Sequence, residues 1–358
     1  MMRPSAVQTT VRAATALLLA AACLPAQRPP ERPRSARILR VGPLEAGPGE
    51  VVTGNVLIDK RLDGSKIRLP FILVNGMRPG PVLGLFACMY GKGYEAGIET
   101  VVRLTRDVVA PKTLKGAIIA SPVINPSAFN TRTTHAVEDG VDLQEAFPGD
   151  PHGTHSRRLA AFLFENAVKQ CDAVINLHAK AGMDWSVVMT HDDPEVQRRS
   201  VALAEAYGTP IFTMSHKRHP NFLVVAAMNE GIPAFISEPV YASPHDRPPG
   251  TSIRGLLNVM KYLGMLEGRI DPQTDNLVPS GRYLRTIIRS REAGIIQVLK
   301  EPGDPVKKGE AIALVRTVLG DVVERIKSPG AGYFRRAAPG RVVQMGGYVG
   351  EIFQIPDR

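Results

Sequence analysis

The sequence predicts an α/β fold in which a mostly parallel or mixed sheet is covered by helices on both faces, followed by a small all-β unit. Between residues 67 and 268, short apolar runs alternate with longer segments whose apolar residues recur at helical spacing. After about residue 285, short apolar runs are separated by Gly and Pro turns, which is typical of a compact β unit. A chain of 358 residues with only three cysteines buries its core without a disulfide framework.

The N-terminal residues 1–26 have the pattern of a secretory signal. Arg3 and Arg12 supply a positive region, and the apolar run over residues 13–22 is followed by small residues that suit cleavage. This run is shorter than the ~20 residues that a membrane-spanning helix needs. We expect export from the cytoplasm, either as a soluble protein or, alternatively, with a lipid anchor at Cys23.

Residues 27–37 are rich in Pro and Arg and predict a linker, because proline disfavours both helices and central strands. Residues 1–40 hold most of the net charge of +10, because they contain seven Arg and one Glu. The rest of the chain carries only +4. Nucleic-acid binding is excluded as a function class, because it requires a basic stripe on a folded face.

The α/β domain is predicted over residues 38–284 and the C-terminal β domain over residues 285–358. Strands alternating with helices favour βαβ units and a largely parallel sheet. The expected strands are residues 67–74, 81–88, 116–124, 173–177, 187–190, 210–214 and 233–237, and the expected helices are residues 97–107, 154–170, 195–207 and 252–266. The β domain resembles a lipoyl- or biotinyl-type barrel-sandwich, but it lacks a lysine motif for modification, so we interpret it as structural.

Two polar residues directly follow predicted strands and are candidates for a functional site. His178 follows the strand at 173–177, and Glu238 follows the strand at 233–237. Ligands of open parallel sheets bind beyond the carboxyl ends of the strands, and a carboxylate there can serve as a general base. The alternatives are that a local hydrogen bond satisfies His178 and that Glu238 caps the next segment.

Other polar residues lie in predicted loops. Candidate segments are the turn at residues 91–95, the stretch at residues 139–149, and Arg132 with His135 on the preceding loop.

Two histidine pairs have a spacing that could hold a metal, but each lies in a loop without a third ligand, so we expect these side chains to be exposed. They are His152 with His155 and His216 with His219. Cys88 and Cys171 lie in or beside apolar runs and are expected to be buried free thiols.

Four segments, in this order, resemble the succinylglutamate desuccinylase/aspartoacylase family of the zinc carboxypeptidase clan. The resemblance extends from about residue 67 to 355, so it includes the C-terminal β unit. The segments are Gly84–Ala87 with Gly97–Glu99, Asp139–Leu143 with Phe147–Gly149, Asn176–His178, and Ile236–Glu238.

The resemblance implies zinc-dependent hydrolysis of a small acyl-amino acid or peptide-like amide. In such sites two histidines and a glutamate hold Zn²⁺, and a second glutamate takes a proton from the metal-bound water. Arginines bind the carboxylate of the substrate. The resemblance implies that His178 is a metal ligand, that Glu238 is the general base and that Arg132 is one of the catalytic arginines.

The metal-binding motif departs from the family pattern at its first ligand. In one register Tyr90 occupies the position of the first ligand histidine, and Gly93 that of the ligand glutamate. A register shifted by two residues places Lys92 at the histidine position and Glu95 at the glutamate position. Neither tyrosine nor a charged lysine suits Zn²⁺ as well as histidine does. We therefore take Glu95 as the candidate second metal ligand and Tyr90 as a candidate substrate-binding residue.

The substrate-binding motif also differs from that of the family. Its Asn-Arg pair is replaced by Gln144 and Glu145, our other candidate substrate-binding residues, and the aspartate that precedes the third ligand is Asn176. Glu145 reverses the charge at a position where an anionic group would be held. Two hypotheses follow, a metal-dependent amide hydrolase with a rearranged site, or a non-catalytic ligand- or partner-binding protein on the hydrolase fold.

Overall fold

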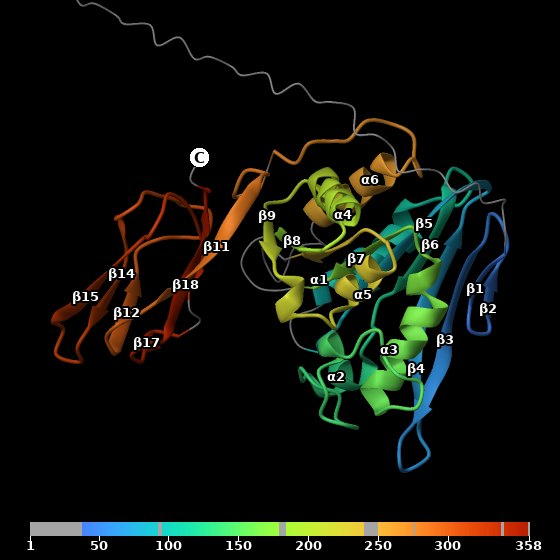
Figure 1. Cartoon of the computed structure of the whole chain (residues 1–358), viewed down its shortest axis with the longest axis horizontal. Helices are drawn as coiled ribbons and strands as arrows, with labels where there is room; N and C mark the ends of the chain where they lie inside the picture. The colour runs from blue at the N-terminus through green and yellow to red at the C-terminus, as the bar shows by residue number, and fades with distance from the viewer. Residues whose placement is uncertain are drawn as a thin grey trace, which may run out of the picture.

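The computed structural model describes residues 38–91, 95–178, 184–239, 250–274, 276–337 and 340–356. Within these residues a twelve-stranded mixed sheet passes through both parts of the chain (Figure 1). Its strands, in spatial order, are β13 (Pro305–Val306), β16 (Gly332–Ala337), β18 (Tyr348–Gln354), β11 (Arg282–Arg289), β9 (Ile211–Met214), β8 (Trp185–Met189), β10 (Ala234–Glu238), β7 (Ala173–Leu177), β5 (Arg78–Ala87), β6 (Lys115–Ser121), β4 (Lys66–Asn75) and β3 (Val51–Lys60).

The centre of this sheet has the parallel pairing that the sequence predicts. β10 pairs parallel with β7, β7 with β5, and β5 with β6. The pairs β8–β10, β4–β6 and β3–β4 are antiparallel, which makes the sheet mixed. β10 and β7 are completely buried, because a sheet with helices on both faces buries both faces of its central strands.

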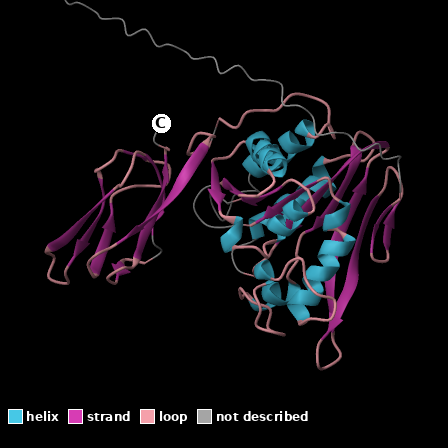
Figure 2. Cartoon of the chain, in the orientation of Figure 1, coloured by secondary structure: helices cyan, strands magenta, loops and turns pink. Residues whose placement is uncertain are grey.

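Helices cover both faces of the sheet, as predicted (Figure 2). One hydrophobic cluster joins α1 (Glu95–Arg103), α4 (Pro194–Tyr207) and α6 (Gly250–Tyr262) to the sheet. A second cluster on the other face includes α3 (His155–Asn166) and α5 (Leu223–Asn229). The remaining helical segments are α2 (Pro126–Thr131), a π-helix at Leu104–Val108, and 3-10 turns at Leu143–Glu145, Val168–Gln170 and His216–Arg218.

Local sequence signals explain where α4 begins and ends. Asp193 precedes the helix, and its carboxylate accepts hydrogen bonds from the backbone amides of Glu195 at 2.8 Å and Val196 at 3.4 Å. Pro194 fits the first helical position, because that amide has no helical partner. Gly208 ends the helix with a φ of +93°, a conformation that favours glycine.

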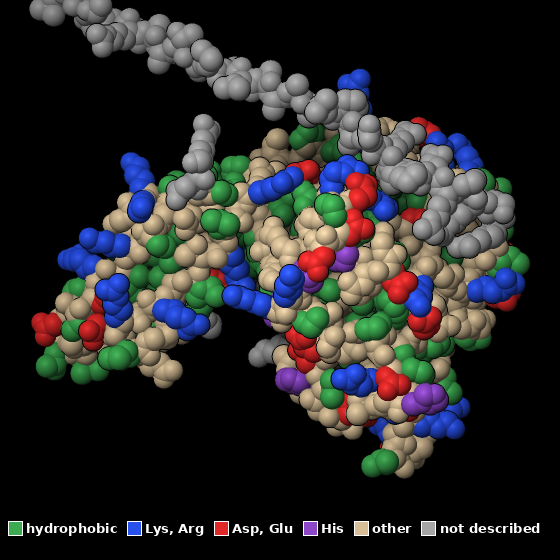
Figure 3. Space-filling model, in the orientation of Figure 1, with side chains coloured by type: hydrophobic (Ala, Val, Ile, Leu, Met, Phe, Trp, Pro, Cys, Tyr) green, Lys and Arg blue, Asp and Glu red, His purple; other side chains and the backbone are tan. Residues whose placement is uncertain are grey.

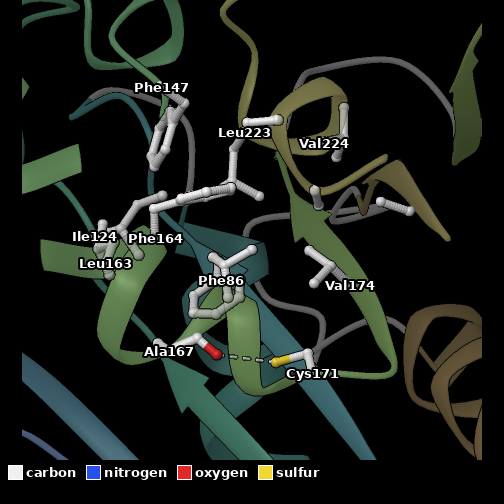
Figure 4. Packing of buried hydrophobic residues seen from close by; sticks show 14 of the residues in the cluster. Phe86, Ile124, Phe147, Leu163, Phe164, Ala167, Cys171, Val174, Leu223 and Val224 are labelled. Atoms are coloured by element: carbon white, nitrogen blue, oxygen red, sulfur yellow. Dashed lines mark hydrogen bonds between the residues drawn. The ribbon is translucent and has the colours of Figure 1, made fainter. Parts of the chain in front are cut away.

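The predicted burial of the Cys88 and Cys171 thiols is confirmed. The Cys171 thiol donates a hydrogen bond of 3.3 Å to the carbonyl oxygen of Ala167, among Phe86, Phe164 and Val174 (Figure 4). Cys88 is buried as well. These cysteines therefore behave as small core residues.

The C-terminal β unit is a sandwich whose two sheets enclose a separate hydrophobic cluster. β13, β16, β18 and β11 form one sheet, which joins the central sheet where β11 pairs with β9. The other sheet contains β15 (Val322–Lys327), β14 (Ala311–Arg316), β12 (Gly294–Val298) and β17 (Val342–Val343). Figure 1 shows this unit, coloured orange to red, beside the α/β part. The predicted boundary at residue 285 falls inside β11.

Several elements and one histidine differ from what the sequence predicts. Besides α2 and α5, the missed elements are β3 and the hairpin of β1 (Leu39–Val41) and β2 (Leu44–Ala46). The expected exposure of His155 is wrong, because this side chain begins α3 and is 5% exposed. Its Nδ1 lies 2.8 Å from the Asp59 carboxylate. His152 is exposed as predicted, whereas His216 and His219 are partly buried.

No helix within the described ranges is long and apolar enough to span a membrane. The proposed leader at residues 1–26, including Cys23, and the linker at residues 27–37 lie outside these ranges. Lys92 and Gly93, which the two registers of the metal motif involve, also lie outside them.

Candidate functional site

Three neighbouring parallel strands end at the same edge of the sheet and bring the predicted site residues together. Leu177 at the end of β7 is in register with Ala87 of β5 on one side and with Ser237 of β10 on the other. The His178 amide then donates a 2.8 Å hydrogen bond to the Ser237 carbonyl oxygen. Tyr90, His178 and Glu238 therefore lie at one carboxyl edge, the expected location of a ligand site in an open α/β sheet.

A sharp turn after β5 directs the chain toward Tyr90. Cys88 has a φ of +58°, which is uncommon for a residue other than glycine. Its thiol donates to the carbonyl oxygen of Tyr90 at 3.2 Å. Burial, together with the charge of Glu95, raises the pKa of the Cys88 thiol to about 12. Cys88 therefore remains a protonated thiol that stabilises this turn rather than a nucleophile.

The Tyr90 side chain is held by hydrogen bonds from its hydroxyl group. The hydroxyl lies 2.5 Å from Gln144 Oε1 and 3.4 Å from the Asp142 carboxylate. Burial raises the pKa of Tyr90, and the nearby charges of Asp142, Glu145 and Glu238 raise it further. A neutral phenol therefore acts as a hydrogen-bond donor at one of the two positions that the resemblance offers for the first ligand histidine.

His178 is buried beside Tyr90 and is oriented by Asn176. The two rings of Tyr90 and His178 meet edge-on with their centroids 5.9 Å apart. His178 Nε2 lies 2.7 Å from Asn176 Oδ1, while Asn176 Nδ2 donates to the Phe86 carbonyl oxygen at 2.8 Å. Because that amide oxygen can only accept, Nε2 must carry the proton.

Glu238 is buried at the end of β10 and contacts both parts of the molecule. Its carboxylate accepts a hydrogen bond from Trp185 Nε1 and lies 3.6 Å from Nη2 of Arg335, a residue of β16. The Arg335 guanidinium stacks 3.5 Å from the centroid of the Trp185 ring. The predicted general base is therefore held by an indole and faces a cation from the C-terminal β unit.

The predicted catalytic arginine and the candidate ligand glutamate form an ion pair with each other. Arg132 Nη2 lies 3.1 Å from Glu95 Oε1, and the two side chains are 67% and 42% exposed. Arg132 ends α2 in the left-handed region with a φ of +54°. Exposed pairs of this kind are weak, ~0–1 kcal/mol. The catalytic role of Arg132 and the metal-binding role of Glu95 stay predictions.

The segment that replaces the Asn-Arg pair of the family forms a short 3-10 turn. Asp142 caps this turn by accepting a 2.9 Å hydrogen bond from the Gln144 amide. Gln144 is buried and faces Tyr90, as described above. Glu145 is partly exposed, with its carboxylate 3.3 Å from His219 Nδ1. Gln144 thus reaches the site from the segment that the sequence identified, but the segment has an acidic rather than a basic side chain.

These donors do not fit the zinc site that the family resemblance implies. Among the described residues, no three His, Cys, Asp or Glu side chains are grouped as metal ligands. Tyr90 is bonded to Gln144, His178 Nε2 to Asn176, and Glu95 to Arg132. Since Zn²⁺ in such sites takes at least three protein ligands, we derive no metal-dependent step for this chain.

Two residues that contact the predicted base, Trp185 and Arg335, are not among the site residues predicted from the sequence. Trp185 is the only tryptophan of the chain and opens β8, directly beside β10. Its indole also stacks on Phe212 with a centroid separation of 4.0 Å. Arg335 comes from a strand almost 100 residues further along the chain than Glu238. No local motif links either residue to the strand ends, so only the tertiary fold identifies them.

The fold and this edge define an α/β protein with its site at the ends of parallel strands and a C-terminal β unit beside it. Comparisons with known proteins identify the family. Residues 80–239 match the sequence model described as "Succinylglutamate desuccinylase/Aspartoacylase catalytic domain". This match to the catalytic domain of the succinylglutamate desuccinylase/aspartoacylase family confirms the resemblance seen in the sequence.

Relatives of known activity and known structure agree with this assignment. The N-alpha-acetyl-L-2,4-diaminobutyric acid deacetylase of Halomonas elongata is 27% identical over 244 residues, which cover 66% of this chain and 70% of that protein. The family thus contains deacylases of acyl-amino acids.

Solved structures show the same fold at low sequence identity. The succinylglutamate desuccinylase/aspartoacylase of Rhodobacter sphaeroides is 22% identical with a TM-score of 0.71, over 85% of this chain and 95% of that one. The product-bound ectoine utilization protein of Ruegeria pomeroyi is 18% identical with a TM-score of 0.73, over the same shares of the two chains.

Proposed function

We propose that this protein binds a small N-acyl amino acid or a related peptide-like amide at the edge formed by Tyr90, His178 and Glu238. We further propose that it has lost the zinc-dependent hydrolysis of its family, or retains only a weak form of it. The acyl-amino acid class is supported by the Halomonas elongata relative, whose name specifies an N-acetylated amino acid. The strand-end location of the polar side chains supports a small ligand.

One observation supports the proposed loss of zinc-dependent hydrolysis. At one of the two positions that the family motif offers for its first ligand histidine, the Tyr90 hydroxyl is bonded to Gln144. A metal ligand must direct a lone pair toward the ion, and a neutral phenol does so poorly. The arrangement around Tyr90 therefore supports a hydrogen-bond network rather than a set of metal ligands.

Metal content tests this proposal directly. The protein from Gln27 to Arg358 is dialysed against trace zinc and subjected to elemental analysis, together with the variants Tyr90→His/Gly93→Glu and Tyr90→Phe. We expect no stoichiometric zinc in the wild-type protein or in Tyr90→Phe. We expect a clear gain in the double variant, which restores the two ligand types of the family motif. About one zinc per wild-type chain, lost in His178→Ala, would contradict the proposal.

Ligand binding tests the other half of the proposal. N-acetyl-L-2,4-diaminobutyrate is titrated into the wild-type protein by isothermal calorimetry, with free 2,4-diaminobutyrate as the control for the acyl group. We expect saturable binding of the acetylated compound and weaker binding of the free amino acid. Glu238→Ala should reduce the affinity, because Glu238 is the buried carboxylate at this edge.

The second candidate function is a metal-dependent amide hydrolase with a rearranged site. The observation that favours it is Glu238, which is buried at the end of β10 and which the resemblance assigns as the catalytic glutamate. If acyl-amino acid hydrolysis is measurable, Glu238→Gln should reduce kcat by about two or more orders of magnitude while the fold survives. Unchanged activity in that variant would exclude Glu238 as the base.

We also propose that the protein is exported through the leader at residues 1–26. The positive region and short apolar run of the sequence support this location. N-terminal sequencing of protein recovered from the cell envelope and from the medium checks it. A mature N-terminus near Gln27 is expected for a soluble form, and a lipid-modified Cys23 for the anchored form. An intact Met1 in recovered protein would contradict export.

A further inference from the structure

Arg335 brings a buried cation from the C-terminal β unit to the candidate site. Its side chain is 1% exposed, stacks on Trp185 and faces Glu238 at 3.6 Å. Its Nη1 donates a 2.6 Å hydrogen bond to the carboxylate of Glu351 on β18. The guanidinium therefore lies between the core of the β unit and the end of β10.

The charges around Arg335 leave an excess of positive charge. Glu351 accepts hydrogen bonds from Arg285 at 2.8 Å, from Arg335 at 2.6 Å and from Arg336 at 3.1 Å. Together with Glu238 this gives, among the described residues, three arginines and two carboxylates. Arg285 and Arg336 are 30% and 32% exposed, so solvent compensates part of their charge, whereas Arg335 is 1% exposed.

The unpartnered donors of Arg335 point to a site for an anion. Of its guanidinium nitrogens, Nε and Nη2 are buried and have no hydrogen-bond partner among the residues that the structure describes, and Nη2 lies 3.6 Å from the Glu238 carboxylate. These two nitrogens form one edge of the planar group, which suits a carboxylate bound through both oxygens. Arg285 uses this same edge for Glu351, with Nε at 3.1 Å and Nη2 at 2.8 Å. Buried donors left unsatisfied are rare in native proteins.

We propose that Arg335 is the anion-binding residue of the site and receives the carboxylate of the bound acyl-amino acid through Nε and Nη2. The inference rests on the proposed binding function and names the residue that selects for the acid group of the ligand. It also accounts for Glu145, since the arginine that this segment lacks is supplied by the C-terminal β unit. Glu238, beside Arg335, accepts the amide N–H of the same ligand.

The only tryptophan of the chain allows a direct test. Because Trp185 lies 3.5 Å from the Arg335 guanidinium, its fluorescence reports occupancy of this position. The titrants are N-acetyl-L-2,4-diaminobutyrate and the corresponding carboxamide, which lacks the negative charge. For the wild-type protein we expect a saturable change in emission, with the carboxamide bound about tenfold or more weakly than the acid.

Three variants separate recognition from structure. Arg335→Gln should weaken binding of the acid about tenfold or more and bind acid and carboxamide equally. Arg335→Lys, which keeps the charge but loses the planar pair of donors, should give an intermediate affinity. Arg325→Gln removes one exposed positive charge from the same β unit and should bind both compounds as the wild-type protein does. Far-UV circular dichroism confirms that each variant is folded.

The outcomes distinguish this inference from the proposed function. If the wild-type protein and folded Arg335→Gln bind the acid equally, the role of Arg335 is wrong while the binding function stands. If the wild-type protein binds neither compound, both proposals are overturned. Should Arg335→Gln fail to fold, equal binding of acid and carboxamide by the wild-type protein or by Arg335→Lys would still refute the inference.

Discussion

The phenol of Tyr90 decides how the residues at the strand ends are arranged. In one register of the family motif this position would hold a metal-binding histidine, whereas here the phenol directs a proton toward Gln144. The bond couples the turn after β5 to the segment that follows α2. We expect this coupling to be measurable, because both groups are largely removed from solvent.

A double-mutant cycle with Tyr90→Phe and Gln144→Leu tests this coupling. Removal of the hydroxyl alone leaves the Gln144 oxygen without this donor and should destabilise the protein by about 1–3 kcal/mol. The double variant should lose less than the sum of the two single losses. Urea unfolding followed by circular dichroism measures each value. Additive losses would show that the hydrogen bond contributes no net stability.

Glu351 makes the stability of the β unit depend on pH in the acid range. Burial alone would raise its pKa, but the hydrogen bond from Arg285 and the charges of Arg335, Arg285 and Arg336 lower it from 4.5 to about 2. Because the folded-state value is depressed, the stabilisation is complete above about pH 4.5 and is lost as the pH falls toward about 2.

The expected contribution of this group is about 3 kcal/mol over that pH range. The free energy of unfolding should therefore fall between pH 5 and pH 2 more steeply in the wild-type protein than in Glu351→Gln, which is less stable at neutral pH. Urea unfolding at several pH values measures both slopes. Identical slopes would mean that Glu351 does not titrate in this range.

At the scale of elements, Gly91 sets the contact between the strand ends and α2. A Cβ atom at this position would lie 1.7 Å from the carbonyl oxygen of Ala128, and the Gly91 amide donates to the Thr133 carbonyl oxygen at 2.8 Å. Only glycine allows the backbone of Tyr90 to approach the helix so closely. The position of the phenol thus depends on its neighbour in the sequence.

Gly91→Ala should force α2 away from the strand ends and destabilise the protein by about 1–3 kcal/mol. Gly281→Ala serves as the matched control, since a Cβ there has its nearest neighbour at 3.5 Å and an ordinary contact. Thermal unfolding compares the two variants. A loss in Gly281→Ala as large as that in Gly91→Ala would contradict the steric explanation.

The elements that the sequence predicted are those with a clear apolar pattern. All seven predicted strands of the α/β region and all four predicted helices are present, with shifted ends. The edge strand β3 was missed because its side chains are mostly exposed or half-buried, so it forms no apolar run. β6 ends at Ser121, earlier than predicted, because Pro122 cannot donate in the ladder. Short helices such as α2 give too few turns for a period to be seen.

At the scale of the whole molecule, the α/β part and the β unit share one sheet and one aromatic contact. β11 pairs with β9, and Trp185 packs against Phe353 of the β unit with ring centroids 5.6 Å apart. Together with the ion pair of Arg335 and Glu238, these contacts link the two hydrophobic cores. The stability of each part therefore depends on the other.

We expect the two parts to unfold in a single transition. Far-UV circular dichroism reports the whole chain, while the fluorescence of Trp185 reports the region between the two parts. The midpoints of urea unfolding from the two signals should coincide. A fluorescence transition at clearly lower urea than the circular dichroism transition would show that the β unit separates first.

The sequence predicts the site residues that directly follow apolar strands. It does not predict those that distant segments bring to the site. His178 and Glu238 follow apolar strands directly, so their position at the sheet edge can be predicted from the pattern. The pairing of Arg132 with Glu95 and the approach of Arg335 depend on how distant segments pack. Figure 3 shows Lys and Arg side chains spread over the surface of the β unit, and nothing in the sequence distinguishes buried Arg335 from these.

Arg335 also affects how the sequences of family members should be compared with one another. The family match ends at residue 239, so an alignment of the catalytic domain alone leaves out the cation that faces Glu238. Two members with identical strand ends would differ in ligand preference if their β units differed at this one position. A chimera that exchanged only the β unit would then exchange specificity as well, and the C-terminal sequence becomes the part to read when substrates are assigned.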